Sequence, residues 1–197
     1  MALLLAAILG LTGDPPCPLA DIGPAPAVAL VDALNRPFRL DSLRGKVVVV
    51  SFIYTTCNGT CPATTAELAR VRKALKDEHL WGDKVAFVSV TLDPARDTPE
   101  TLANYAHGYR VVDDDWHFLT GPEAKVNASL KAWDMWARRL PDGAIDHPSR
   151  VFLVDPSGRR REIYSLETLS AKLVVADTRS LLAEAREMHR PSDKSPR

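Results

Sequence analysis

Apolar positions along the chain fall into two patterns, continuous runs and helical stripes. Residues 46–54 and 84–92 are nearly continuous runs rich in β-branched side chains, a pattern typical of strands buried on both faces. Between them, apolar residues such as Leu68 and Val71 recur on one face of the segment 62–76, which predicts an amphipathic helix. This order of strand, helix and strand predicts an α/β protein with a central sheet and helices on both faces.

Weaker signals predict the remaining elements. Asp97 and Glu100 form a capping box with Pro99 in the first helical turn, so we expect a helix that begins at about residue 98. The other expected elements are a hairpin at 27–40, a strand at 116–121, a helix at 124–136, a second hairpin at 149–164 and a helix at 166–188. Together they predict a thioredoxin-like architecture, a mixed central sheet flanked by helices with an N-terminal hairpin.

The first 25 residues differ in character from the rest. Met1–Leu11 is an apolar run too short for a membrane-spanning helix, which needs about 20 residues, but long enough for the apolar region of a signal peptide. Residues 1–25 are therefore expected to hold an export signal or anchor and a linker, with a simple apolar tail as the alternative. Within them, Cys17 is either a lipid-attachment residue or an isolated thiol. We expect one thioredoxin-like domain over 26–189 and a disordered polar tail over 190–197.

The balance of charged residues bears on whether the chain binds nucleic acid. Lys plus Arg number 25 and Asp plus Glu number 25, so the chain of 197 residues has no net positive charge to attract a nucleic acid. The short arginine clusters are typical of solvated surface. Nucleic acid is therefore not an expected partner.

Two cysteines with three residues between them, Cys57 and Cys61, separate the first predicted strand from the first predicted helix. They could form a disulfide, act as a redox couple or bind a soft metal ion. Because neither lies in an apolar stripe, a purely structural role is disfavoured. If Cys61 is the N-cap and Pro62 the first helical residue, the helix dipole should favour a thiolate at Cys61. The pair also falls at the carboxyl end of a strand, where sites form in α/β sheets.

The spacing of the pair bears on which chemistry it supports. Thioredoxin-type redox pairs have two intervening residues, and the third residue here permits a wider separation of the sulfurs. Two thiolates do not complete a zinc site, which takes four ligands, whereas two thiolates and one imidazole suit copper, Cu(I) in particular. The chain offers five histidines, and spacing alone does not choose among them: His79, His107, His117, His147 and His189.

Four sequence blocks follow one another along the chain: "SFIYTTCNGTCPATTAEL", "FVSVTLDPARDTPETLANYA", "WHFLTG" and "DHPSRVFLVDPSGR". Taken in this order, they resemble the SCO/SenC/PrrC family of copper chaperones for the assembly of cytochrome c oxidase. The resemblance runs from about Phe38 to Tyr164. Any one block would be a weak signal, but four in the same order are a strong one.

The resemblance implies a thioredoxin-like fold and a copper site whose ligands are Cys57, Cys61 and His147. It implies one copper ion, as Cu(I), Cu(II) or both, and the copper centre of cytochrome c oxidase subunit II or a related copper protein as the target. The protein would deliver copper or reduce the target's cysteines. It would work outside the cytoplasm, on the periplasmic side, with membrane association through the N-terminus and a thiol reductant as a further partner.

Alternatives to this function stay open. The main one is a thiol–disulfide oxidoreductase that uses no metal, in which Cys57 attacks and Cys61 resolves. A peroxide-reducing enzyme on the same fold is a weaker alternative.

Neighbouring residues also have alternative roles. Pro148 departs from the small residue of many relatives and stiffens the loop beside His147. Asp97 is expected to be a helix cap and Asp93 either a strand-end turn residue or a support for the site. Asp146 could orient the imidazole of His147.

Overall fold

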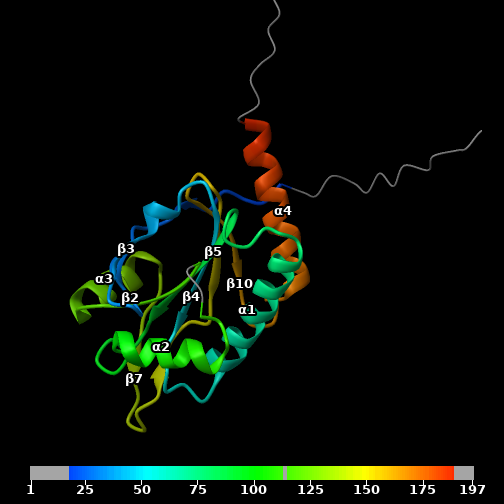
Figure 1. The fold of residues 1–197 in the computed structure, drawn as a ribbon. Helices are drawn as coiled ribbons and strands as arrows, with labels where there is room; N and C mark the ends of the chain where they lie inside the picture. Colours follow the sequence, from blue (N-terminus) through cyan, green and yellow to red (C-terminus); the bar gives the residue numbers. More distant parts are fainter. Residues whose placement is uncertain (1–17, 113–114, 189–197) are drawn as a thin grey trace, which may run out of the picture.

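The computed structural model describes residues 18–112 and 115–188 (Figure 1). Residues 1–17, with Cys17 and most of the expected export segment, lie outside this range, and so do residues 189–197, with His189 and the expected tail. The expectations about them stay predictions. Within this range, no helix combines the length and the apolar character that a membrane crossing requires.

The core is a mixed eight-stranded sheet with the strand order β1-β10-β9-β4-β5-β6-β2-β3. Its centre is the parallel pair β4 (Val47–Ile53) and β5 (Val85–Thr91), in which every residue is buried. The continuous apolar runs therefore predicted these two strands correctly. The other strands are β1 (Gly23–Pro24), β2 (Ala29–Asp32), β3 (Pro37–Arg39), β6 (Trp116–Thr120), β9 (Val151–Val154) and β10 (Arg159–Tyr164).

Both predicted hairpins are confirmed, as β2–β3 and β9–β10. In the first, the Asp32 carboxylate accepts hydrogen bonds from the backbone N–H groups of Leu34 and Arg36, which closes the turn. In the second, Gly158 has a φ of +79°, a backbone conformation that glycine adopts without strain.

Helices cover the sheet. The two long helices, α1 (Thr60–Asp77) and α4 (Ala171–Met188), lie side by side and contact each other (Figure 1). The shorter α2 (Pro99–Gly108) contacts β6 and α3 (Glu123–Ala132) contacts β2, while a 3₁₀ turn, η1 (Leu40–Leu43), follows β3. The prediction of an α/β protein with a mixed central sheet flanked by helices is confirmed.

The expected cap of α2 was wrong. Thr98 is the N-cap residue, and its side chain accepts a hydrogen bond from the backbone N–H of Thr101. Asp97, the expected cap, is instead fully buried, and its carboxylate accepts hydrogen bonds from Thr55 and Thr91. Two adjacent residues were both suitable caps, and the burial of Asp97 decided between them.

Two further helices are shorter than expected because local turns interrupt them. α3 ends at Ala132 instead of residue 136, and Asp134 follows with a φ of +54°. α4 begins at Ala171 instead of residue 166, because Ser165 and Thr168 exchange side-chain and backbone hydrogen bonds in a turn of their own.

A small second sheet lies beside the large one. Its strands β7 (Arg138–Arg139) and β8 (Ile145–Asp146) form a hairpin that ends immediately before His147. Figure 1 shows β7 at the lower end of the molecule, toward the end where α1 begins. The hairpin thus brings a late segment of the chain to the carboxyl end of β4.

Candidate metal centre

The loop between β4 and α1 holds the two cysteines in different environments. Cys57 is partly exposed, and its sulfur accepts a hydrogen bond from the backbone N–H of Gly59 at 3.4 Å. Cys61 is 2% exposed and packs in the hydrophobic core. Gly59 is the N-cap of α1, so Cys61 lies within the first helical turn and is not the cap that the sequence suggested.

These environments reverse the expected acidity of the two thiols. Burial raises the pKa of the Cys61 thiol well above its ordinary value, and the hydrogen bond that it shares with Cys57 raises it further. Burial opposes ionisation of Cys57 as well, but hydrogen bonds from Cys61, Gly59 and Tyr54 outweigh it and lower the pKa of the Cys57 thiol. The prediction of a thiolate at Cys61 was therefore wrong, and Cys57 carries the more acidic sulfur.

Among the histidines that the structure describes, His147 is the one that reaches the cysteine pair. Its Nε2 lies 3.8 Å from Sγ of Cys61, although the two residues are 86 positions apart in the sequence. Its Nδ1 lies 2.9 Å from the carbonyl oxygen of Pro148, which only accepts hydrogen bonds, so Nδ1 carries the proton. In the neutral ring this leaves the lone pair of Nε2 facing the sulfur of Cys61, the tautomer in which Nε2 can coordinate a metal ion.

The carboxylate beside His147 has a different partner. Asp146 pairs with Arg138 across the β7–β8 hairpin, so the imidazole is oriented by the carbonyl of Pro148 and not by this side chain. Pro148 thus contributes an acceptor to the site in addition to stiffening its loop.

Two thiols and one imidazole are a donor set for a soft metal ion. Within the described part of the chain, no three Cys, His, Asp or Glu side chains stand in the geometry of a finished metal site. Cys61 is nevertheless the neighbour of both other residues, since its Sγ lies 3.8 Å from Nε2 of His147 and shares a hydrogen bond with Cys57. Their role as ligands stays a prediction.

The site opens into a cleft of about 540 Å³ between the cysteine loop and the β7–β8 hairpin. Cys57 and His147 line it, together with Tyr54, Arg96 and Gly143. Since Cys61 lies deeper, a visiting molecule would meet Cys57 and His147 first.

Two residues of the hairpin segment, Arg139 and Ile145, fix it beside the cleft. Arg139 donates to the buried carboxylate of Asp93 at 2.6 Å and also to the carbonyl of Gly143. The backbone N–H of Ile145 donates to the hydroxyl of Tyr54 at 3.3 Å. Asp93 therefore holds the segment that precedes His147, which is more than the strand-end turn role that the sequence also allowed.

Asp97 holds the cysteine side of the cleft. Its carboxylate accepts hydrogen bonds from the backbone N–H and the hydroxyl of Thr55, two residues before Cys57, and from the hydroxyl of Thr91 on β5. Burial raises the pKa of this carboxyl, although these hydrogen bonds oppose the shift. Sequence reasoning missed these contacts, and also Tyr54. The available signal was a hydroxyl at the end of an apolar strand.

The other described histidines lie elsewhere. His79 follows the end of α1 and His107 lies in the last turn of α2. His117 is on β6, where its ring packs against Phe38 with 4.7 Å between the ring centroids. Among the described histidines, His147 is therefore the one that lies beside a candidate cysteine ligand, a point that spacing alone left open.

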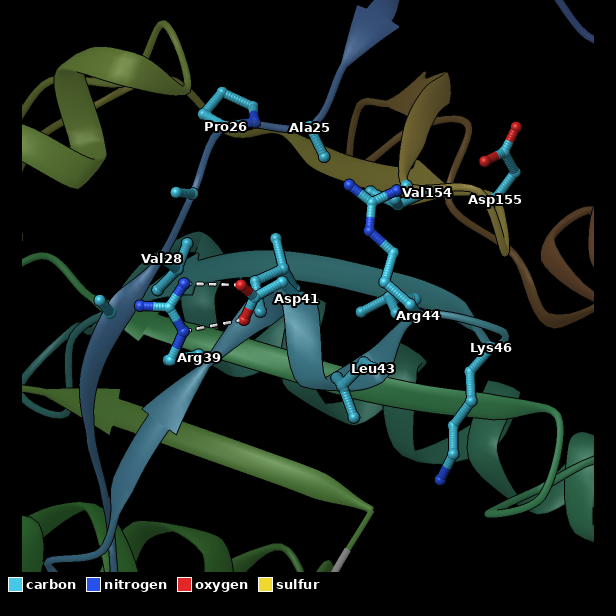
Figure 2. Close-up of a pocket in the computed structure, with 15 residues that line it drawn as sticks. Ala25, Pro26, Val28, Arg39, Asp41, Leu43, Arg44, Lys46, Val154 and Asp155 are labelled. Carbon is cyan, nitrogen blue, oxygen red and sulfur yellow. Dashed lines mark hydrogen bonds and ion pairs between the residues drawn. The ribbon is translucent and has the colours of Figure 1, made fainter.

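A separate crevice of about 240 Å³ lies between the N-terminal segment 25–29, η1 and the start of β4 (Figure 2). Its apolar wall includes Val28 and Leu43, and the Arg39–Asp41 ion pair and Arg44 border it. No cysteine or histidine occurs among the described residues that line it. This crevice therefore offers no soft-metal chemistry.

A family model and the curated relatives of this chain point to the same family. The family model described as SCO1/SenC matches residues 25–183. The SCO1 protein homolog of Bacillus subtilis is 32% identical over 146 residues, which cover 72% of this chain and 74% of that protein.

Solved structures agree with this match. Bradyrhizobium japonicum ScoI with copper bound is 27% identical, has a TM-score of 0.68, and is matched over 80% of this chain and 98% of that one. BsSco, described as a member of the Sco family of cytochrome c oxidase assembly proteins with a disulfide switch, is 27% identical with a TM-score of 0.72, over 84% of this chain and 97% of that one. The predicted thioredoxin-like fold is confirmed.

Proposed function

Because the chain belongs to the SCO1/SenC family, we propose that it is a copper chaperone that helps to assemble the copper centre of cytochrome c oxidase subunit II. The observation that carries the proposal is the approach of Nε2 of His147 to Sγ of Cys61 at 3.8 Å, beside Cys57. Exchange between a dithiol and a disulfide does not require an imidazole as a third donor at this place. Copper, the cargo, accounts for it.

Cys57, Cys61 and His147 are the proposed ligands. Both thiols give up their protons when they bind the ion, and the neutral imidazole donates its Nε2 lone pair. A donor set of two sulfurs and one nitrogen favours Cu(I) and tolerates Cu(II).

Transfer follows from the unequal exposure of the ligands. Thiolates of the target enter the cleft, bind the ion from its open side and displace Cys57 and His147 before the buried Cys61. The copper keeps its oxidation state, and ligand exchange alone moves it.

The same thiols make the site sensitive to oxidation. Loss of two electrons and two protons joins Cys57 to Cys61 in a disulfide, which no longer binds copper. Since thiols outside the cytoplasm tend to be oxidised, a thiol reductant is the implied partner of a protein that works there. An extracytoplasmic location with N-terminal attachment to the membrane completes the proposal.

A second candidate function has an observation of its own in its favour. The lowered pKa and the exposure of Cys57, next to a buried Cys61 that can resolve a mixed disulfide, suit a thiol–disulfide oxidoreductase. In that function Cys57 attacks a target disulfide and Cys61 then releases the reduced target. His147 is not required.

Copper titration of the reduced protein separates the two functions. Wild type should bind one equivalent of Cu(I), and Cys57→Ser and His147→Ala should each lose most of the affinity. Exchange of the dithiol with a model disulfide should survive in His147→Ala and disappear in Cys57→Ser. If both variants bind copper as tightly as wild type, the chaperone proposal is wrong.

A further inference from the structure

Tyr54, the residue after β4, touches every side chain of the proposed copper site. Its hydroxyl lies within hydrogen-bonding reach of the sulfur of Cys57, and its backbone N–H within reach of the sulfur of Cys61. Its ring meets the ring of His147 edge to face, with 5.9 Å between the centroids and an interplanar angle of 89°. The three candidate ligands thus share one neighbour.

The hydroxyl of Tyr54 also joins the two halves of the site. It accepts a hydrogen bond from the backbone N–H of Ile145 at 3.3 Å, which leaves its own proton for Cys57. Ile145 is on β8, two residues before His147. A single buried hydroxyl therefore links the cysteine loop to the segment that presents the histidine.

The environment of this side chain supports a defined geometry. Tyr54 is 5% exposed, and packing holds its ring between the loop and the hairpin. Without the hydroxyl, a Phe ring of the same shape could fill the space. Packing therefore does not require the hydroxyl oxygen. Its two partners, Cys57 and the backbone N–H of Ile145, both belong to the segments that form the site.

We propose that Tyr54 is a positioning residue that sets the preference of the site for Cu(I) over Cu(II) through its hydrogen bond to Cys57. This inference rests on the proposed copper function. A donor aimed at a ligating sulfur withdraws electron density from it, and Cu(II) depends more strongly than Cu(I) on donation from a thiolate. Hydrogen bonds around a ligating cysteine sulfur tune copper potentials in this way.

Tyr54→Phe tests the role, with Tyr105→Phe as the matched control. Tyr105 is a partly buried tyrosine whose hydroxyl shares hydrogen bonds with Thr65, at 2.8 Å, and with Tyr109, but with no candidate ligand. The affinities for Cu(I) and Cu(II) are measured separately, together with the reduction potential and the sulfur-to-copper absorption band of the Cu(II) form. Amide exchange at Ile145 is followed without copper.

In Tyr54→Phe, the ratio of Cu(I) to Cu(II) affinity should fall by about tenfold, the lower end of what one hydrogen bond to a charged acceptor contributes. The potential should fall, the absorption band should shift, and the amide of Ile145 should exchange faster. Tyr105→Phe should change none of these. An unchanged ratio in Tyr54→Phe, or an equal change in both variants, would overturn the role while wild-type copper binding stood. A wild type that bound no copper would overturn the proposed function and this role together.

Discussion

At the scale of single residues, the two cysteines of the shared motif differ in exposure and in acidity. Cys57 is partly exposed and has the lowered pKa, while Cys61 is buried and has the raised one. From the sequence, the helix dipole was expected to favour a thiolate at Cys61. In the structure, burial of the Cys61 sulfur has the larger effect on its pKa and raises it. Copper and disulfide partners should therefore meet Cys57 first.

Alkylation measures this difference directly. In the reduced, copper-free protein, iodoacetamide should modify Cys57 at least tenfold faster than Cys61, because thiolate and exposure both favour it. The rate at Cys57 should reach half its maximum at a lower pH than for an ordinary thiol. Peptide mass spectrometry gives the rates, and the unfolded protein, with both thiols exposed, is the control. Equal rates in the folded protein would contradict the assignment.

His117 offers a test away from the site. Burial lowers its pKa, and the nearby carboxylates of Asp32 and Asp115 only partly oppose this. A neutral His117 therefore stabilises the fold above the unfolded-state pKa of about 6.5, and this contribution is lost as the pH falls through the lowered folded-state pKa.

The free energy of unfolding should accordingly drop less between pH 7 and pH 5 in His117→Gln than in wild type. Urea denaturation at each pH measures the drop, and proton NMR of the folded protein gives the pKa itself. A folded-state pKa at or above 6.5 would show that burial does not govern this side chain.

At the scale of elements, the β7–β8 hairpin is the part of the fold that completes the site. It has two adjacent arginines with unequal partners. Arg139 reaches the carboxylate of Asp93, whose side chain is 1% exposed, whereas Arg138 pairs with the partly exposed Asp146. Loss of the first leaves a buried charge with Arg96 at 3.8 Å as its remaining ion-pair partner.

Arg139→Gln should therefore lower the free energy of unfolding by about 1–3 kcal/mol. It should also weaken copper binding, because the segment before His147 loses its anchor. Arg138→Gln, the neighbouring control, should cost about 0–1 kcal/mol, as exposed ion pairs do. Urea denaturation and copper titration of both variants check this. Equal effects of the two changes would show that the contact with Asp93 does not hold the hairpin.

The elements also show what the sequence could predict. β4 and β5 were predictable because a buried parallel strand needs an uninterrupted apolar run, and the sequence displays one. The start of α2 was missed because Asp97 and Thr98 are both good caps, and only the tertiary bonds of Asp97 to Thr55 and Thr91 distinguish them. Helix ends depend on such contacts, which are remote in sequence.

The residues of the candidate site likewise fall into those that the sequence could predict and those that it could not. Cys57 and Cys61 were predictable from their own motif, but His147 came only from family resemblance, since no local pattern marks a histidine that lies 86 positions from its partner. The roles of Tyr54 and of the Arg139–Asp93 pair were out of reach for the same reason. Each joins segments that only the folded sheet brings together.

At the scale of the whole molecule, the site draws on segments from both halves of the chain. The cysteine loop follows β4, and the segment with His147 leads into β9, which pairs with β4 in the sheet. Binding of copper at this junction should therefore stabilise the entire fold.

Copper should raise the free energy of unfolding by about 2.7 kcal/mol when free Cu(I) is at 100 times the dissociation constant, less whatever the unfolded thiols bind. The gain should vanish in Cys57→Ser and in protein oxidised to the disulfide. Thermal unfolding at fixed, buffered Cu(I) measures it. A gain of the same size in the oxidised protein would place the copper elsewhere.

The central claim is that one copper ion is held by Cys57, Cys61 and His147. X-ray absorption of the Cu(I)-loaded protein tests it most directly, with His147→Ala measured beside wild type. We expect two sulfur ligands and one imidazole nitrogen in wild type, and loss of the imidazole signal in the variant. A wild-type spectrum without an imidazole, or an imidazole signal that persists in His147→Ala, would contradict the claim.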